Sequence, residues 1–68
     1  MSLSITVNGQ QRTVPDDATL ADVVNALGQA PEALATAVNG DFVPRIARAD
    51  VRMREGDAVF TFQPITGG

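Results

Sequence analysis

Two Asn-Gly pairs, at residues 8–9 and 39–40, limit what this chain of 68 residues can fold into more than any other feature. Both residues of such a pair tolerate the positive φ of a type I′ turn, which joins two antiparallel strands with only two residues. The residues before the first pair, 3–7, alternate between apolar and polar, as expected of a half-buried strand. The sequence therefore predicts two β-hairpins, one at the start of the chain and one past its middle.

The turn length also predicts the register of the first hairpin, in which residues 10–14 return as the second strand. A two-residue turn sets three pairs opposite one another: Val7 and Gln10, Ile5 and Arg12, Leu3 and Val14. Arg12 then lies on the core side, a conflict that is relieved by snorkelling from an edge strand or by a bulge that shifts the register. The second hairpin joins residues 36–38 to a short strand at 41–43, which Pro44 ends.

An amphipathic helix is predicted between the two hairpins. Thr19 is a favourable N-cap, and Asp22, three residues later, completes an acidic variant of the capping box. A spacing of i, i+3, i+4 and i+7 places one apolar stripe on the helix, made of Leu20, Val23, Val24 and Leu27. Gly28 stands where a helix C-cap is expected. Residues 31–34 are ambiguous and allow one further helical turn.

The last third of the chain holds a crossing segment and a final strand. Residues 46–51 show no clear period and predict an irregular segment that crosses to the last strand, with the side chains of Ile46 and Val51 buried beneath it. Residues 54–57 predict a tight turn into a last strand at 58–63. A last strand that follows a long crossover is expected beside the first strand and parallel to it. The whole pattern predicts an α+β fold of the β-grasp (ubiquitin-like) type, a mixed sheet of four to five strands with one main helix packed on one face.

Composition argues against most kinds of independent chemistry. The five basic residues are all arginine and face eight acidic ones, so the net charge of −3 opposes a nucleic-acid partner. Cysteine, histidine and lysine are absent, which removes the usual nucleophiles, near-neutral acid–base groups and zinc ligands. The missing cysteines fit a reducing compartment, and no apolar run is long enough for a membrane span. We therefore expect a small cytoplasmic protein with no membrane association that is not an enzyme by itself.

Residues 64–68 end the chain in a segment suited to project from the domain. Pro64 has a fixed φ and no N–H to extend a β-ladder, and it biases the residue before it toward an extended conformation. Gly67 and Gly68 lack a Cβ, so a carboxylate on this stem fits a slot too narrow for any other dipeptide. The pattern predicts a folded domain at 1–63 and an extended flexible tail at 64–68. A merely frayed terminus is the simpler alternative.

Five short segments occur in a familiar order: Ile5-Thr6-Val7-Asn8-Gly9, Ala37-Val38-Asn39-Gly40, Val43-Pro44-Arg45, Glu55-Gly56-Asp57 and Ile65-Thr66-Gly67-Gly68. Together, and over the whole chain, they resemble the ThiS family, the small ubiquitin-like sulfur carriers of thiamine (thiazole) biosynthesis. Two features depart from the pattern of the family, Arg12 and the run Phe60-Thr61-Phe62, and neither touches the tail. Arg45, within one of the segments, is predicted to have a structural or peripheral contact role.

The resemblance implies that the Gly68 carboxylate is the functional group. An E1-like enzyme of the ThiF type adenylates it with ATP, sulfur from a donor protein gives a thiocarboxylate, and a ThiG-type thiazole synthase takes the sulfur. Pro64, Ile65, Thr66 and Gly67 then form the tail that threads into the active sites of these partners. ATP is used by the activating partner, and the chain itself is expected to bind no cofactor or metal. A terminal carboxylate is ionised at neutral pH and is a poor electrophile, which agrees with activation by another protein.

The resemblance also bears on the last strand. Strand alternation places Ala58, Phe60 and Phe62 on one face and Val59, Thr61 and Gln63 on the other. Hydrophobicity alone favours burial of the two phenylalanines. In related carriers, however, the residue after Gly-Asp is exposed and the next, here Val59, is buried. We therefore predict that Val59 packs under the helix, while Phe60 and Phe62 are at least partly exposed and form a docking patch for the partner enzymes.

Two other functions remain open from the sequence. The small subunit of molybdopterin synthase is a sulfur carrier with the same fold and Gly-Gly tail, although it is usually longer. A β-grasp binding module or protein tag, with a tail that is inert or joined to lysines, is the alternative from a different class. Formation of a thiocarboxylate on the tail separates this second alternative from both sulfur carriers.

Overall fold

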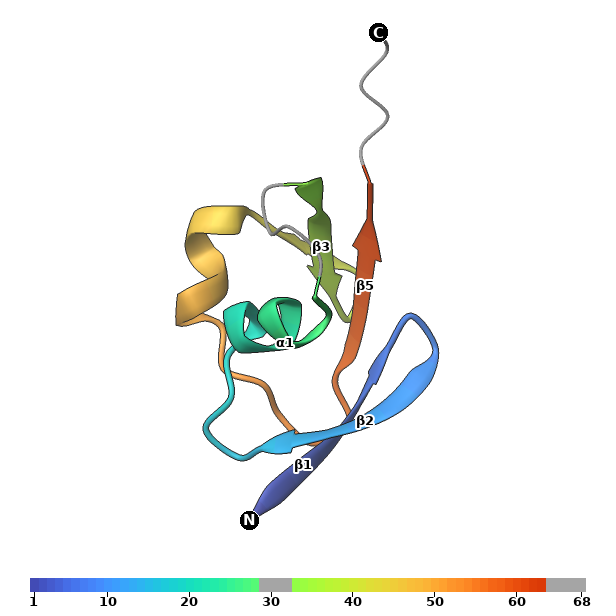
Figure 1. Cartoon of the computed structure of the whole chain (residues 1–68), viewed down its shortest axis with the longest axis vertical. Coiled ribbons are helices and arrows are strands. Elements are labelled where there is room, and N and C mark those ends of the chain that lie inside the picture. Colours follow the sequence, from blue (N-terminus) through green and yellow to red (C-terminus); the bar gives the residue numbers. More distant parts are fainter. Residues whose placement is uncertain (29–32, 64–68) are drawn as a thin grey trace, which may run out of the picture.

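The computed structural model of the chain describes residues 1–28 and 33–63. Within these ranges the elements, in chain order, are β1 (Ser2–Val7), β2 (Gln10–Pro15), α1 (Leu20–Ala26), β3 (Ala35–Val38), β4 (Asp41–Val43), the 3₁₀ helix η2 (Arg45–Asp50) and β5 (Ala58–Phe62). The strands form one sheet in the order β2-β1-β5-β3-β4, and α1 lies across one face of it (Figure 1). This is the β-grasp architecture that the sequence predicts.

The last strand, β5, occupies the centre of the sheet and runs parallel to β1, as predicted. Thr6 pairs with Ala58 and Val7 pairs with Val59. On its other side β5 is antiparallel to β3, in a register that runs from Val38 opposite Val59 to Ala35 opposite Phe62. Neighbouring strands therefore hold β5 on both sides, and β5 is the element that leads into the tail.

Both Asn-Gly hairpins form as predicted. Asn8 and Asn39 each have a φ of 53°, and the glycines that follow also have positive φ, as a type I′ turn requires. The register of β1 and β2 includes all three predicted pairs, with Ile5 opposite Arg12. Arg12 is exposed although Ile5 is buried, because β2 is the edge strand of the sheet. The uninterrupted register leaves no bulge in this pair of strands.

The predicted signals for the start and end of the helix are both confirmed. The Asp22 backbone N–H donates to Thr19 Oγ1 at 3.3 Å, and the Thr19 N–H donates to Asp22 Oδ2 at 3.0 Å, which completes the capping box. Gly28 follows the C-cap residue Leu27 with a φ of 74°. The buried face of α1 packs into a core with residues of the sheet and with Met53 of the segment before β5; the core consists of Ile5, Val7, Leu20, Val23, Val43, Met53 and Val59. The ambiguous stretch at 31–34 lies partly outside the described residues. In the part of the chain that is described, no helix is long and apolar enough to cross a membrane.

The crossing segment differs from its prediction. Residues 45–50 form a 3₁₀ helix, and Ile46 is 88% exposed, so the expectation that the Ile46 side chain is buried is wrong. Arg48 is the buried residue of η2, and Val51 follows the helix as its C-cap residue. Both side chains face the protein: Val51 packs against the core, as predicted, and Arg48 is only 3% exposed.

Arg48 connects η2 to the start of β3. Its Nε donates to Thr36 Oγ1 at 3.1 Å, and one of its terminal nitrogens, Nη2, donates to the Leu34 carbonyl oxygen at 2.6 Å. The Thr36 hydroxyl in turn donates to the Val43 carbonyl oxygen at 2.9 Å. A charged donor thus satisfies acceptors at the start of β3, and the network joins η2, β3 and β4 below the surface.

We expect the substitution Arg48→Met to lower the free energy of unfolding by about 1–3 kcal/mol. The apolar side chain leaves the buried Leu34 carbonyl oxygen without this donor, and an unsatisfied buried acceptor costs about that much. Urea unfolding of the two proteins measures the difference. Arg45→Met is the matched control, because Arg45 is exposed on the same 3₁₀ helix and its loss is expected to change stability by less than about 0.5 kcal/mol. Equal effects of the two substitutions would contradict the structural role of Arg48.

Candidate functional site

The predicted site has two parts, the tail and the face of the sheet that leads to it. The tail residues Pro64, Ile65, Thr66, Gly67 and Gly68 lie outside the described residues, so their roles and the domain boundary after residue 63 stay predictions. The strand β5 ends at Phe62, one residue short of the tail, and its central place in the sheet fixes the base from which the chain continues.

The two faces of β5 are occupied as predicted. Val59 is 0% exposed and belongs to the core, whereas Phe60 is 43% exposed and Phe62 is 48% exposed. The side chains of β5 alternate between the core and the opposite face of the sheet, here called the outer sheet face. The exposure of the two phenylalanines is therefore confirmed, while their role in docking stays a prediction.

Phe42 belongs to the same surface, although it is not among the residues predicted for the docking patch. Ala37 of β3 lies opposite Phe42 of β4 on one side and opposite Phe60 of β5 on the other. Residues directly opposite each other in an antiparallel pair share a face, so all three lie on the outer sheet face. Phe42 is 66% exposed, and Ala37, between the two rings, is only 8% exposed. We call Phe42, Phe60 and Phe62 the phenylalanine patch.

The outer sheet face carries no charge at any outward position of the five described strands. The register assigns to it Ser2, Ser4, Thr6, Gln11, Thr13, Pro15, Ala35, Ala37, Phe42, Ala58, Phe60 and Phe62. Its apolar half covers β5, β3 and β4, and its polar, uncharged half covers β1 and β2. Depletion of charge around exposed aromatic residues is typical of the core of a protein–protein interface. The face thus combines an apolar centre with hydrogen-bonding side chains beside it.

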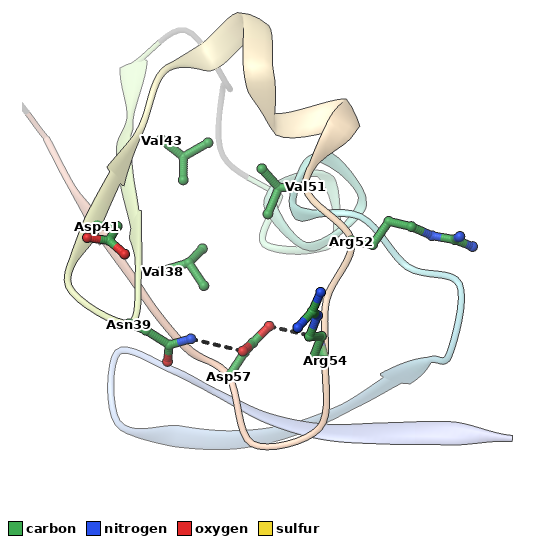
Figure 2. A pocket seen from close by; sticks show the side chains of 8 residues that line it. All are labelled: Val38, Asn39, Asp41, Val43, Val51, Arg52, Arg54 and Asp57. Atoms are coloured by element: carbon green, nitrogen blue, oxygen red, sulfur yellow. Dashed lines mark hydrogen bonds between the residues drawn. The ribbon is translucent and has the colours of Figure 1, made fainter.

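A shallow cavity of about 420 Å³ lies at the other end of β5, away from the tail. Figure 2 shows Val38, Val43 and Val51 pointing into it. Its polar wall is the nearly buried carboxylate of Asp57, which accepts hydrogen bonds from Asn39 Nδ2 at 2.9 Å and from the Arg54 backbone N–H at 2.8 Å. These bonds hold the turn before β5 in shape, so the carboxylate has a structural function here.

Among the described residues, no group of three or more histidine, cysteine, aspartate or glutamate side chains is placed to hold a metal ion. None of the buried side-chain nitrogen or oxygen atoms described lacks a hydrogen-bond partner. The feature that stands out on the described part of the chain is the exposed phenylalanine patch on β4 and β5.

Comparison with known proteins agrees with the fold described above. The chain matches the ThiS family over residues 5–68. It is similar to the crystal structure of a thiamine biosynthesis protein (ThiS) from Geobacter metallireducens, with a TM-score of 0.83 and 29% identity over 97% of this chain and 100% of that one. A solution NMR structure of a thiamine biosynthesis protein from the same organism gives a TM-score of 0.76 and 29% identity, over 97% of this chain and 88% of that one.

A more distant similarity supports the fold alone. The crystal structure of SAMP1 from Haloferax volcanii has a TM-score of 0.62 and 18% identity, and the match covers 100% of both chains. No curated protein matches the sequence.

Proposed function

The chain belongs to the ThiS family, and from this we propose that it is a sulfur carrier of thiamine biosynthesis. The observation that carries the proposal is the family match over residues 5–68, which includes the Gly67–Gly68 ending. The similarity in fold and length to a thiamine biosynthesis protein of Geobacter metallireducens supports it. In this function the chain supplies an acyl group and a docking surface, and partner enzymes supply the catalysis.

The proposed reaction takes place at the Gly68 carboxylate. An E1-like enzyme of the ThiF type transfers AMP from ATP to this carboxylate, and pyrophosphate leaves. A sulfur donor protein then supplies sulfur at the oxidation level of sulfide, which attacks the acyl carbon, expels AMP and leaves a thiocarboxylate at Gly68. A thiazole synthase of the ThiG type finally takes the sulfur. Because the ionised carboxylate is a poor electrophile, adenylation is the step that makes its carbonyl carbon reactive.

The other residues of the site have binding roles in this proposal. Pro64, Ile65, Thr66 and Gly67 carry Gly68 into the active site of each partner, where the two glycines pass the narrowest part. The phenylalanine patch docks on the same partners, because exposed aromatic side chains in a surface without charge are favoured interface anchors. Docking through the sheet and reaction at the tail are thus separate tasks of adjacent parts of the chain.

We expect intact-protein mass spectrometry to detect a thiocarboxylate after incubation with a ThiF-type enzyme, ATP and a sulfur donor. The mass should rise by the difference between sulfur and oxygen, and the fragment that carries the change should contain Gly68. Omission of ATP is the control and should leave the mass unchanged. A chain that stays unmodified with the complete mixture, or that becomes joined to lysines of other proteins, would contradict the proposed function.

A further inference from the structure

The two asparagines of the hairpin turns also bind the last strand with their side chains. Asn8 Oδ1 accepts the Thr61 backbone N–H at 3.0 Å, and Asn8 Nδ2 donates to Thr61 Oγ1 at 2.9 Å. At the other end of β5, Asn39 Oδ1 accepts the Ala58 backbone N–H at 3.0 Å. Its Nδ2 donates to Asp57, as Figure 2 shows. Each turn therefore holds one end of β5, and the two ends differ in one respect, since Thr61 lies at the end of β5 that leads toward the tail.

The Asn8 side chain supplies hydrogen bonds to β5 at the point where the backbone pairing of β1 with β5 ends. β1 stops at Val7, which pairs with Val59, and the Asn8 backbone N–H bonds to the Val59 carbonyl oxygen at 2.8 Å. Beyond that point β1 offers no backbone partner to β5, although β3 still pairs with it as far as Phe62. The Asn8 carboxamide presents an acceptor and a donor to Thr61, as a backbone amide would.

From this geometry we propose that Asn8 is a positioning residue for the sulfur-carrier reaction, acting through Thr61. Its carboxamide holds the last part of β5 on the side that β1 leaves uncovered, and so fixes the direction in which the chain leaves the sheet toward Gly68. This role rests on the proposed function. A small error in the placement of a reacting group slows a reaction strongly even when binding is unchanged. Since Asn8 is exposed, its bonds add little to the stability of the fold.

Two substitutions of Asn8 separate its side-chain bonds from its place in the turn. Asn8→Gly keeps the positive φ but removes the carboxamide. Asn8→Asp also tolerates this φ, and its carboxylate accepts hydrogen bonds from both the N–H and the hydroxyl of Thr61. Asn39→Gly is the matched control, because it removes the same kind of side chain from the same kind of turn at the opposite end of β5. Thr61→Val, which removes only the hydroxyl, tests the pair from its other side.

The experiment measures adenylation of each full chain by a ThiF-type enzyme and, by NMR, hydrogen exchange at the Thr61 amide. For Asn8→Gly we expect kcat to fall about fivefold to tenfold, with KM within about twofold of the wild-type value, because docking through the phenylalanine patch is unchanged. The Thr61 amide should exchange faster in this variant. Asn8→Asp should restore kcat to within about twofold, Asn39→Gly should leave kcat unchanged, and Thr61→Val should give an intermediate value.

Two results would overturn the positioning role of Asn8 and leave the proposed function standing: a wild-type kcat for Asn8→Gly, or an equal loss of kcat for Asn39→Gly. Thermal unfolding of each variant identifies any that fails to fold. If Asn8→Gly fails to fold, the kcat values of Asn8→Asp and Thr61→Val decide whether the reaction needs the bonds between Asn8 and Thr61. A wild-type chain that is not adenylated at all would overturn the proposed function, and the role of Asn8 with it. The two failures are therefore distinguishable by the behaviour of the wild-type protein.

Discussion

Deletion of Gly68, or addition of a single residue after it, is expected to abolish adenylation and to leave the fold unchanged. The proposed reaction occurs at one carboxylate, and either change moves the carboxylate by one residue, about 3.5 Å, relative to the surface that docks. A displacement of that size removes the reacting atoms from bonding distance of ATP in the partner. The measurement is release of pyrophosphate with the ThiF-type enzyme, and thermal unfolding reports on the fold.

Gly67→Ala is the companion variant for the tail. It keeps the length and the carboxylate but adds a Cβ at a position that is proposed to pass a narrow slot. We expect a large loss of adenylation here too, smaller than that caused by deletion of Gly68. Unchanged adenylation of the protein without Gly68 would contradict the sulfur-carrier function. Unchanged adenylation of Gly67→Ala would contradict only the narrow slot.

The sequence predicts the sheet well because its turns are local. A two-residue Asn-Gly turn leaves one register for its strands, so the pair Ile5–Arg12 follows from the sequence alone. The same reasoning, applied to the second turn, would have placed Phe42 opposite Ala37 and added it to the phenylalanine patch. The signal for Phe42 was therefore present in the sequence, in the register of the second hairpin.

The features that could not be predicted depend on contacts between distant parts of the chain. Burial of Arg48 goes with its hydrogen bonds to Thr36 and Leu34, which lie 12 and 14 positions earlier in the chain and which the composition of residues 45–50 does not reveal. The bonds from Asn8 to Thr61 join residues 53 positions apart and depend on where β1 ends beside β5. The same asparagine that signals the turn in the sequence thus has a second function that only the folded sheet discloses.

The opposite faces of β5 predict opposite effects for Val59→Ala and Phe62→Ala. Val59 is fully buried in the core, so removal of its two methyl groups should lower the free energy of unfolding by about 2–3 kcal/mol, as transfer and cavity terms add. Phe62 is 48% exposed on the outer sheet face, and its truncation should cost less than about 1 kcal/mol. Chemical denaturation of the two variants measures both values.

Binding should show the reverse order. Phe62→Ala is expected to weaken the complex with the ThiF-type enzyme by about 2 kcal/mol, roughly 30-fold in Kd, as truncation of an aromatic anchor does. Val59→Ala should bind within about twofold of the wild type at a temperature where it is folded, because its side chain does not reach the surface. Ile46→Ala is the control for exposed apolar area, since Ile46 is 88% exposed on η2, outside the phenylalanine patch. If Phe62→Ala unfolds as readily as a core variant, or if Ile46→Ala weakens binding as much, the patch is not the docking surface and partner recognition lies elsewhere on the chain.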